Sequence, residues 1–321
     1  ATPGRLRRFA PAIAVALLLG AAFIGRAVIS SDAAEAIADT FGFLVQGRFE
    51  AATVPAEGPG PRNVFAFRSH YGIFPSLLLL PFTALPWAVR HVLGAAGLDA
   101  GIALAWTTGT LLAVVAFRRL ARVVAPGSSP WWAPAFLAST FLWAYAADSF
   151  FETFAAAGLA CAAAAILEGE VRPGLSPSLV AALAFAGAAL LKPVLWITAP
   201  AFVLGAALAW RGREGAVRRL VAFGALLASG LAAGWAASVL RFGGGENFGY
   251  GDEALRFTTP LLAGLFGLVL SPGRGLLVYA PLALVGLARV FLRGVPPAVT
   301  ALCGGAPLLL VVTAARFEGW H

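Results

Sequence analysis

The sequence predicts an all-α fold, a polytopic membrane helix bundle of about nine spans with two further helices half-embedded in the outer face. Hydrophobic residues make up 60% of the 321 residues and charged residues only 12%. A soluble domain has about 45–50% apolar and about 25% charged residues. Apolar runs of membrane-spanning length recur along the chain, and the charges stand at their ends. This placement excludes nucleic-acid binding as the reason for the net charge of +8, because the charges form no basic face.

The first apolar run, 11–29, follows Arg5, Arg7 and Arg8. Basic residues that flank a span remain in the cytoplasm, so we expect a cytoplasmic N-terminus. No small-residue cleavage site is followed by a soluble domain, so the run is a retained span and not a signal peptide. Residues 30–72 then form an external loop, which is the longest polar segment of the chain.

Within this loop, residues 33–46 have the pattern of a short helix that lies in the membrane interface. The helical period places their apolar side chains on one face, and Glu35, Asp39 and Gln46 fall mostly away from it. The apolar face consists of Ala34, Ile37, Phe41, Leu44 and Val45.

Residues 72–95 are predicted to be half-embedded and not to span the membrane. If they crossed it, the next run would exit outward and place Arg118, Arg119 and Arg122 outside, against the positive-inside rule. Three prolines also interrupt the segment. A second half-embedded helix is predicted at 260–270. The predicted spans are 11–29, 100–117, 131–147, 151–167, 177–191, 194–210, 216–239, 276–292 and 296–315.

This topology divides the charges unequally between the two sides. The cytoplasmic side holds thirteen arginines and three acids, a net charge of +10, and the rest of the chain carries −2. The cytoplasmic set is Arg5, Arg7, Arg8, Arg118, Arg119, Arg122, Glu168, Glu170, Arg172, Arg211, Arg213, Glu214, Arg218, Arg219, Arg289 and Arg293. Nearly all the acids are external, so we expect any chemistry on the outer face.

The source and the extent of the chain are also predicted. Twenty-two arginines against a single lysine, with abundant Ala and Gly, favour a GC-rich bacterial genome and hence the bacterial cytoplasmic membrane. We expect residues 1–321 to form a single transmembrane domain. The chain lacks an initiator Met and stops just past an apolar run, so we expect both ends to be cut.

Four stretches, all near the outer side, carry a resemblance to a known family. They are Ser30–Asp32, Ser69–Pro81, Leu191–Pro193 and Leu270–Pro281. In their order and common sidedness they resemble the GT-C class of glycosyltransferases, in particular the protein mannosyltransferase and aminoarabinose transferase group (glycosyltransferase family 39-like). Two departures stand out. Asp32 is followed by Ala33, where family members often have an Asp-Glu pair, and Ser69-His70-Tyr71 stands where a Lys-Pro-Pro motif is common.

The resemblance implies that a sugar moves from a polyprenyl phosphate or diphosphate donor to an acceptor hydroxyl on a protein, lipid or glycan, with inversion. Such a reaction needs a carboxylate that takes the acceptor proton and cations that stabilise the leaving phosphate. Asp32 is our candidate for the general base. Its alternative role is structural, because Ser31 and Asp32 are good N-cap residues and Glu35 stands at capping-box spacing.

Two cations are candidates for phosphate binding. Lys192, the only lysine, stands between two apolar runs, where a charge at mid-bilayer costs about 2.5–3.5 kcal/mol on insertion scales. Its alternative role is a helix-end residue that extends to the interface. Arg274 stands between Gly273 and Gly275, which let backbone amides approach an anion, and its alternative is a plain loop arginine.

The external loops supply further candidates for substrate or phosphate binding. Arg68, His70 and Tyr71 end the long loop, although a lone His is more often a hydrogen-bonded structural residue. Tyr250 lies in a glycine-rich segment that could close over a substrate.

Acidic residues complete the candidate site. Asp148 and Glu152 lie one turn apart between two spans and could orient the acceptor or the sugar, or they are solvated turn residues. Asp32, Glu35 and Asp39 share one helical face and could hold a divalent cation, although no Asp-x-Asp pattern supports this.

Two other functions remain open from the sequence. A transporter or flippase of lipid-linked sugars would explain an embedded lysine and broken helices. Against it, no internal repeat is visible, and polar residues crowd one face instead of the midplane. A non-catalytic scaffold of an envelope complex is the third hypothesis.

Overall fold

The structure is a computed structural model that describes residues 31–47, 73–138, 151–243, 256–272, 275–292 and 294–317. Every regular element within these ranges is helical, which confirms the all-α class. The elements are α2 (Ser31–Gln46), α3 (Ile73–Ala88), α4 (Arg90–Val124), α5 (Trp132–Ala138), α7 (Glu152–Glu168), α8 (Ser176–Leu191), the 3₁₀ helix η1 (Pro193–Thr198), α9 (Ala199–Trp210), α10 (Ala216–Phe242), α11 (Leu261–Leu270), α12 (Leu276–Tyr279), α13 (Pro281–Val290), α14 (Pro297–Val299), the π-helical η3 (Thr300–Gly305) and α15 (Ala306–Arg316). The predicted span 11–29 and the second half of 131–147 lie outside these ranges.

Four helical segments of the described chain are long and apolar enough to cross a membrane. They are Ala100–Val124, Pro193–Trp210, Ala216–Phe242 and Pro297–Arg316. Shorter apolar helices are Ile73–Ala88, Ser176–Leu191, Leu261–Leu270 and Pro281–Val290. The predicted count of nine spans is therefore not confirmed, because segments such as α8, with 16 residues, fall short of the roughly 17–25 residues that a span needs.

One predicted span, 276–292, is wrong as a continuous helix. α12 ends at Tyr279, and a new helix begins at Pro281. Proline has no N–H for the helical ladder and disfavours the helical conformation of the residue before it. Ala280 accordingly has φ −145° and ψ 54°, outside the helical region. The segment is thus a pair of short helices.

The surface of α10 suits a lipid environment. Only 17% of its most apolar stretch is buried in the described protein, and Leu240 is 88% exposed. Trp235, Val217 and Val221 are exposed as well. A continuous apolar surface of this kind is costly in water but needs no polar cover against lipid chains.

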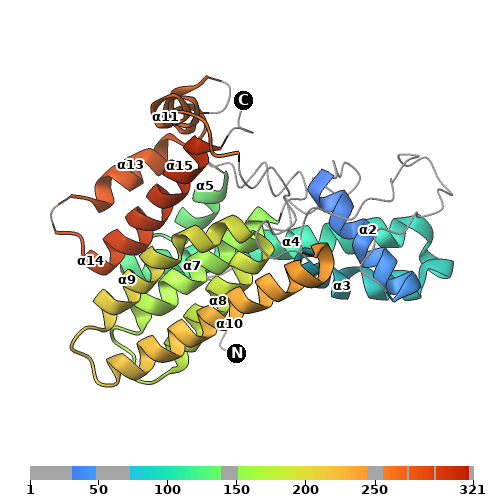
Figure 1. The fold of residues 1–321 in the computed structure, drawn as a ribbon, viewed down its shortest axis with the longest axis horizontal. Coiled ribbons are helices and arrows are strands. Elements are labelled where there is room, and N and C mark those ends of the chain that lie inside the picture. Colours follow the sequence, from blue (N-terminus) through green and yellow to red (C-terminus); the bar gives the residue numbers. More distant parts are fainter. Residues whose placement is uncertain are drawn as a thin grey trace.

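The helices form an elongated bundle in which α7, α8, α9 and α10 occupy the middle (Figure 1). α2 and α3 lie at one end of this bundle, and α11, α13 and α15 lie at the other (Figure 1). The central core is rich in alanine around a few large rings, among them Phe185, Phe202 and Trp210. Small side chains let the backbones approach closely, which is how membrane helices gain packing energy.

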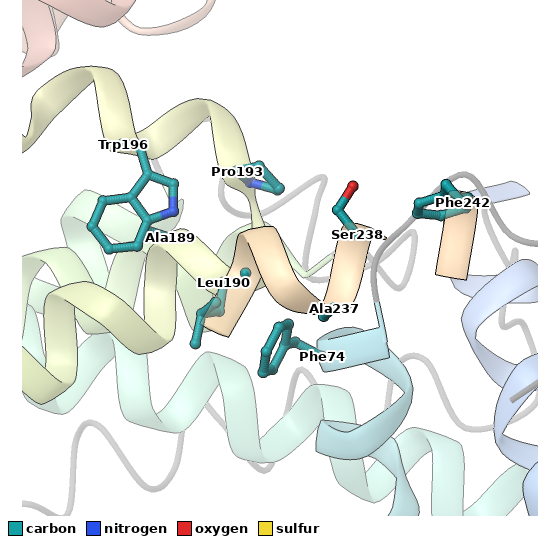
Figure 2. Close-up of a pocket in the computed structure, with 9 residues that line it drawn as sticks. Phe74, Ala189, Leu190, Pro193, Trp196, Ala237, Ser238 and Phe242 are labelled. Carbon is teal, nitrogen blue, oxygen red and sulfur yellow. The ribbon is translucent and has the colours of Figure 1, made fainter. Parts of the chain in front are cut away.

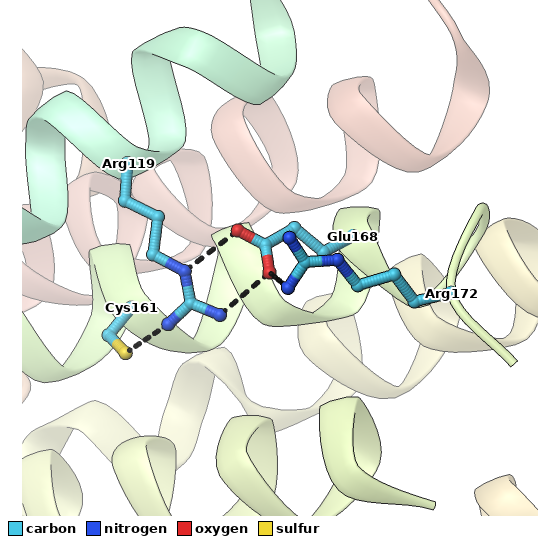
Figure 3. Close-up of polar contacts among 4 residues, drawn as sticks. All are labelled: Arg119, Cys161, Glu168 and Arg172. Atoms are coloured by element: carbon cyan, nitrogen blue, oxygen red, sulfur yellow. Dashed lines mark hydrogen bonds and ion pairs between the residues drawn. The ribbon is translucent and has the colours of Figure 1, made fainter. Parts of the chain in front are cut away.

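Charged residues that the sequence assigned to the cytoplasmic side gather at one end of these helices. Glu168, the last residue of α7, accepts two hydrogen bonds from Arg119, at 2.8 Å and 2.9 Å, and one from Arg172 at 3.2 Å (Figure 3). Nearby, Arg219 donates to the carbonyl of Gly169 at 2.8 Å. Glu152 begins the same helix α7 and therefore lies at its opposite end. A charge predicted on the outer side is thus separated along the bundle from the charges predicted on the cytoplasmic side.

The segment 72–95 differs from the prediction. α3 ends at Ala88, and residues from Arg90 onward belong to the long helix α4. The prediction that prolines interrupt this segment was wrong, because α3 continues through Pro81 and Pro86.

The close contact between α3 and α4 gives a physical reason. Pro86 cannot donate to the carbonyl of Phe82 four residues earlier. Gly101 of α4 lies against that same carbonyl, so closely that an added Cβ would stand 2.3 Å from the oxygen. A glycine Cα–H can contact a carbonyl oxygen left without its helical partner. Pro86 is therefore tolerated inside α3 because Gly101 of α4 packs against the carbonyl oxygen that the proline leaves without a helical hydrogen bond.

The helix predicted at 33–46 is confirmed as α2, but its predicted surface position is wrong. Asp39 and Thr40 are fully buried, whereas the pattern predicted that Asp39 would face away from the apolar side. α2 packs on α3, and Thr40 donates a hydrogen bond to the carbonyl of Ser76 at 3.2 Å. α2 is thus part of the packed protein and not a helix resting only on lipid.

Candidate functional site

Lys192 marks a break between α8 and η1. Pro193 disfavours a helical conformation at the preceding residue, and Lys192 is extended, with φ −135° and ψ 93°. Its Nζ lies 2.8 Å from Oε1 of Glu152, and the two side chains are only 14% and 28% exposed. The second carboxylate oxygen of Glu152 is buried and has no hydrogen-bond partner among the described residues. The structure therefore joins two residues that the sequence proposed separately.

A second ion pair joins Asp39 of α2 to Arg241 in the last turn of α10. Arg241 Nη2 donates to Asp39 Oδ2, and the two side chains are 9% and 0% exposed. Arg241 Nε and Nη1 are buried and have no partner in the part of the chain that is described. Its guanidinium lies 5.5 Å from the ring centre of Phe242.

Sequence reasoning missed Arg241, because the predicted span ended before it. α10 extends further and ends where Gly243 adopts a left-handed conformation, φ +75°, and donates to the carbonyl of Val239 at 2.9 Å. A basic residue two positions before three glycines, on the same predicted side as Asp39, was the available signal. A pairing across 202 positions is not visible in that signal.

A small apolar pocket is lined by residues that lie close in the chain to Lys192 and Arg241 (Figure 2). It is open on one side and is formed by the start of α3, the end of α8, η1 and the end of α10. Its lining residues are Phe74, Ala189, Leu190, Pro193, Trp196, Gly234, Ala237, Ser238 and Phe242. Leu190 and Pro193 lie within two residues of Lys192 in the chain, and Ser238 and Phe242 lie within three residues of Arg241.

This arrangement suits a ligand with an apolar part and an anionic part. The pocket walls offer hydrocarbon and aromatic surface, and two cations stand next to lining residues in the chain. Charges in such surroundings are retained when they are paired or when they serve a ligand. An ammonium group has three donors, so Lys192 can bind several acceptors at once, and Glu152 is one of them.

Most of the other predicted site residues lie outside what the structure describes. Asp32 and Glu35 belong to the first turns of α2, but their side chains are outside the described set. The remaining ones are Arg68, His70, Tyr71, Asp148, Tyr250 and Arg274. The predicted convergence of Asp32, Lys192 and Arg274 therefore remains a prediction. α11, which precedes Arg274 in the chain, lies at the opposite end of the molecule from α2 (Figure 1).

One of the three residues proposed to bind a divalent cation on α2, Asp39, has another partner. The carboxylate of Asp39 is engaged by Arg241 inside the protein. Within the described ranges, no cluster of three or more His, Cys, Asp or Glu side chains could hold a metal ion. Asp39 therefore acts as an ion-pair partner.

Comparison with known proteins adds no further assignment. No protein family matches the chain, and neither the curated proteins nor the solved structures include one that is significantly similar to it.

Proposed function

We propose that the chain is a GT-C-like glycosyltransferase of the bacterial cytoplasmic membrane that takes a sugar from a polyprenyl-phosphate donor on the outer face. The observation that supports this best is the largely buried Lys192–Glu152 pair at a helix break, next in the chain to Pro193, which lines an apolar pocket. A polyprenyl phosphate combines a long hydrocarbon with an anion, which is the chemistry that such a combination recognises. The order of the sequence stretches that resemble this class also supports the proposal.

Three of the candidate residues have defined roles in the proposed reaction. The carboxylate of Asp32 takes the proton of the acceptor hydroxyl. At the same time the oxygen of that hydroxyl forms a bond to the anomeric carbon of the sugar. The bond from that carbon to the phosphate oxygen breaks, and the electron pair leaves with the phosphate. Lys192 stabilises the charge that develops there, and Glu152 holds the ammonium group in place. Attack opposite the leaving group inverts the anomeric centre.

The test is sugar transfer by the full chain reconstituted in lipid nanodiscs. A polyprenyl-phosphate hexose with a labelled sugar is offered with a panel of acceptor peptides, lipids and glycans. We expect transfer by the wild type and a loss of roughly 100-fold or more in Asp32→Asn, since general base catalysis contributes about 10²–10⁴-fold. Asp32→Asn should still bind the donor.

The matched control is Arg172→Ala. Arg172 is exposed and lies at the other end of the bundle, so transfer should be unchanged. Full transfer by Asp32→Asn would show that Asp32 is not the general base. No transfer by the wild type to any acceptor would contradict the proposed function.

The alternative is a transporter or flippase of lipid-linked sugars. The break at Lys192–Pro193 and the short paired helices α12 and α13 favour it, because broken helices line substrate paths in transporters. Vesicles carrying a fluorescent polyprenyl-phosphate sugar decide between the two. Movement of the probe across the bilayer without transfer to an acceptor would favour transport. If neither movement nor transfer is detected, the scaffold hypothesis is favoured.

A further inference from the structure

We propose that the Asp39–Arg241 ion pair is a positioning clamp that sets the rotation of α2 and thereby the place of Asp32. The consequence for Asp32 rests on the proposed function, whereas the clamping of α2 does not. Neither Asp39 nor Arg241 contacts the reacting atoms in this proposal. Their role is to hold the helix that carries the candidate base.

The burial of the pair argues against a role in stability alone. Both side chains are at least nine-tenths buried, and Arg241 leaves two buried N–H groups without a partner in the described chain. Removing an ion from water is costly, and buried pairs are often replaceable by apolar residues without loss of stability. Buried donors without a partner add to that cost. Such a pair is better explained by the orientation it imposes.

The other described contacts of α2 hold it less specifically. Ala36 and Ile37 belong to an apolar cluster with Leu79 of α3, and apolar packing has no directional preference. Thr40 adds one hydrogen bond to α3 and also bonds the carbonyl of Ala36 within its own helix. A charge-assisted hydrogen bond from Arg241 has a defined direction and is roughly twice as strong as a neutral one. The pair therefore fixes the rotation that the apolar contacts leave open.

Helical geometry connects this rotation to Asp32. α2 begins at Ser31, so positions 32 and 39 belong to the same helix. Seven residues are close to two turns, so the backbone at position 32 lies on the same side of α2 as Asp39, about 10.5 Å along the axis. Turning α2 about its axis would therefore move both positions together. The side of α2 that meets the end of α10 is the side on which position 32 stands.

Hydrogen–deuterium exchange and sugar transfer are measured on the same full-chain nanodiscs. Asp39→Asn should raise amide exchange of α2 about tenfold or more and leave α8 unchanged. It should also lower kcat about tenfold, with the donor KM within about twofold, because the base is misplaced and the donor site is intact. The charge swap Asp39→Arg with Arg241→Asp should restore part of both readouts. Glu168→Gln, which breaks an ion pair at the other end, is the control and should leave α2 exchange unchanged.

The double variant Asp39→Asn with Arg241→Met is included because it leaves no uncompensated buried charge if the single variants fail to fold. In every folded variant without the pair, unchanged α2 exchange would overturn the clamp. Faster exchange with full transfer would overturn its link to Asp32. If the wild type transfers no sugar, the proposed function fails, and the exchange measurement still decides whether the pair holds α2.

Discussion

The ammonium nitrogen of Lys192 lies 2.8 Å from a carboxylate oxygen of Glu152, across the junction between the start of α7 and the end of α8. Removing one partner leaves an uncompensated charge in a partly buried place, whereas removing both does not. We expect Lys192→Met and Glu152→Gln each to lower stability by about 1–3 kcal/mol, and the double variant to lie closer to wild type than the sum of the two.

The measurement is thermal unfolding of the purified chain in one detergent, arranged as a double-mutant cycle. Additive losses would show that the two charges do not interact. Glu170→Gln, in an exposed pair with Arg213 at 3.6 Å, is the control and should change stability by less than about 0.5 kcal/mol.

The contact between Gly101 and Phe82 predicts an intolerant position. A Cβ at 101 would stand 2.3 Å from a backbone oxygen and 2.8 Å from Pro86, and neither can move without shifting a helix. We expect Gly101→Ala to destabilise the chain by about 1–3 kcal/mol, as overpacked substitutions do. The control is Gly187→Ala in α8, where the added methyl meets nothing within 4 Å. There, loss of backbone freedom in the unfolded chain should stabilise by about 0.4–1 kcal/mol. Equal melting of both variants would contradict the packing argument.

The pocket predicts a separation of donor binding from stability. Ala237 lines it, so Ala237→Phe fills space that the proposed donor needs. We expect binding of polyprenyl phosphate, measured by quenching of tryptophan fluorescence, to weaken about tenfold or more while the melting temperature changes little. The matched control is Leu240→Phe, one turn later on α10 and 88% exposed. Unweakened binding by Ala237→Phe would exclude this pocket as the donor site.

The Arg119–Glu168–Arg172 cluster predicts a specific acid sensitivity (Figure 3). The hydrogen bonds from Arg119 lower the pKa of Glu168 below its ordinary value of 4.5, with a further contribution from the charges of Arg119 and Arg172. A carboxyl group whose pKa is lowered by folding contributes stability above its unfolded pKa and loses it as the pH falls through the folded one. The cluster should therefore be fully stabilising at pH 7 and weaken below about pH 4.5.

Melting temperatures between pH 7 and pH 3 check this prediction. Glu168→Gln should show a smaller decrease than the wild type below pH 4.5, because it lacks the group that titrates. Parallel curves for the two proteins would contradict the assignment.

Much of the fold was predictable because helices follow local patterns. Apolar runs predicted helices at 177–191 and 260–270, and the structure has Ser176–Leu191 and Leu261–Leu270. The break at Lys192 was predictable from Pro193. Local patterns did not reveal that α3 passes through Pro81 and Pro86, since tolerance of a helical proline depends on what the neighbouring helix places against the freed carbonyl.

The candidate site shows the same limit. Lys192 and Glu152 could be named individually, since an isolated charge in an apolar chain needs a partner or a ligand. Their pairing with each other could not be predicted, because many acids stood on the same predicted side. Arg241 was missed for a related reason, because its burial depends on α2 packing against the end of a distant helix.

By itself the sequence determined the helical class, the apolar character of the bundle and the grouping of charges at helix ends, because each depends on residues close together in the chain. Only the tertiary structure decided that Asp39 is buried, that Arg241 is its partner and that Lys192 meets Glu152. These pairings bring together side chains that are far apart in sequence, and their energies depend on desolvation, which exists only once the helices have packed.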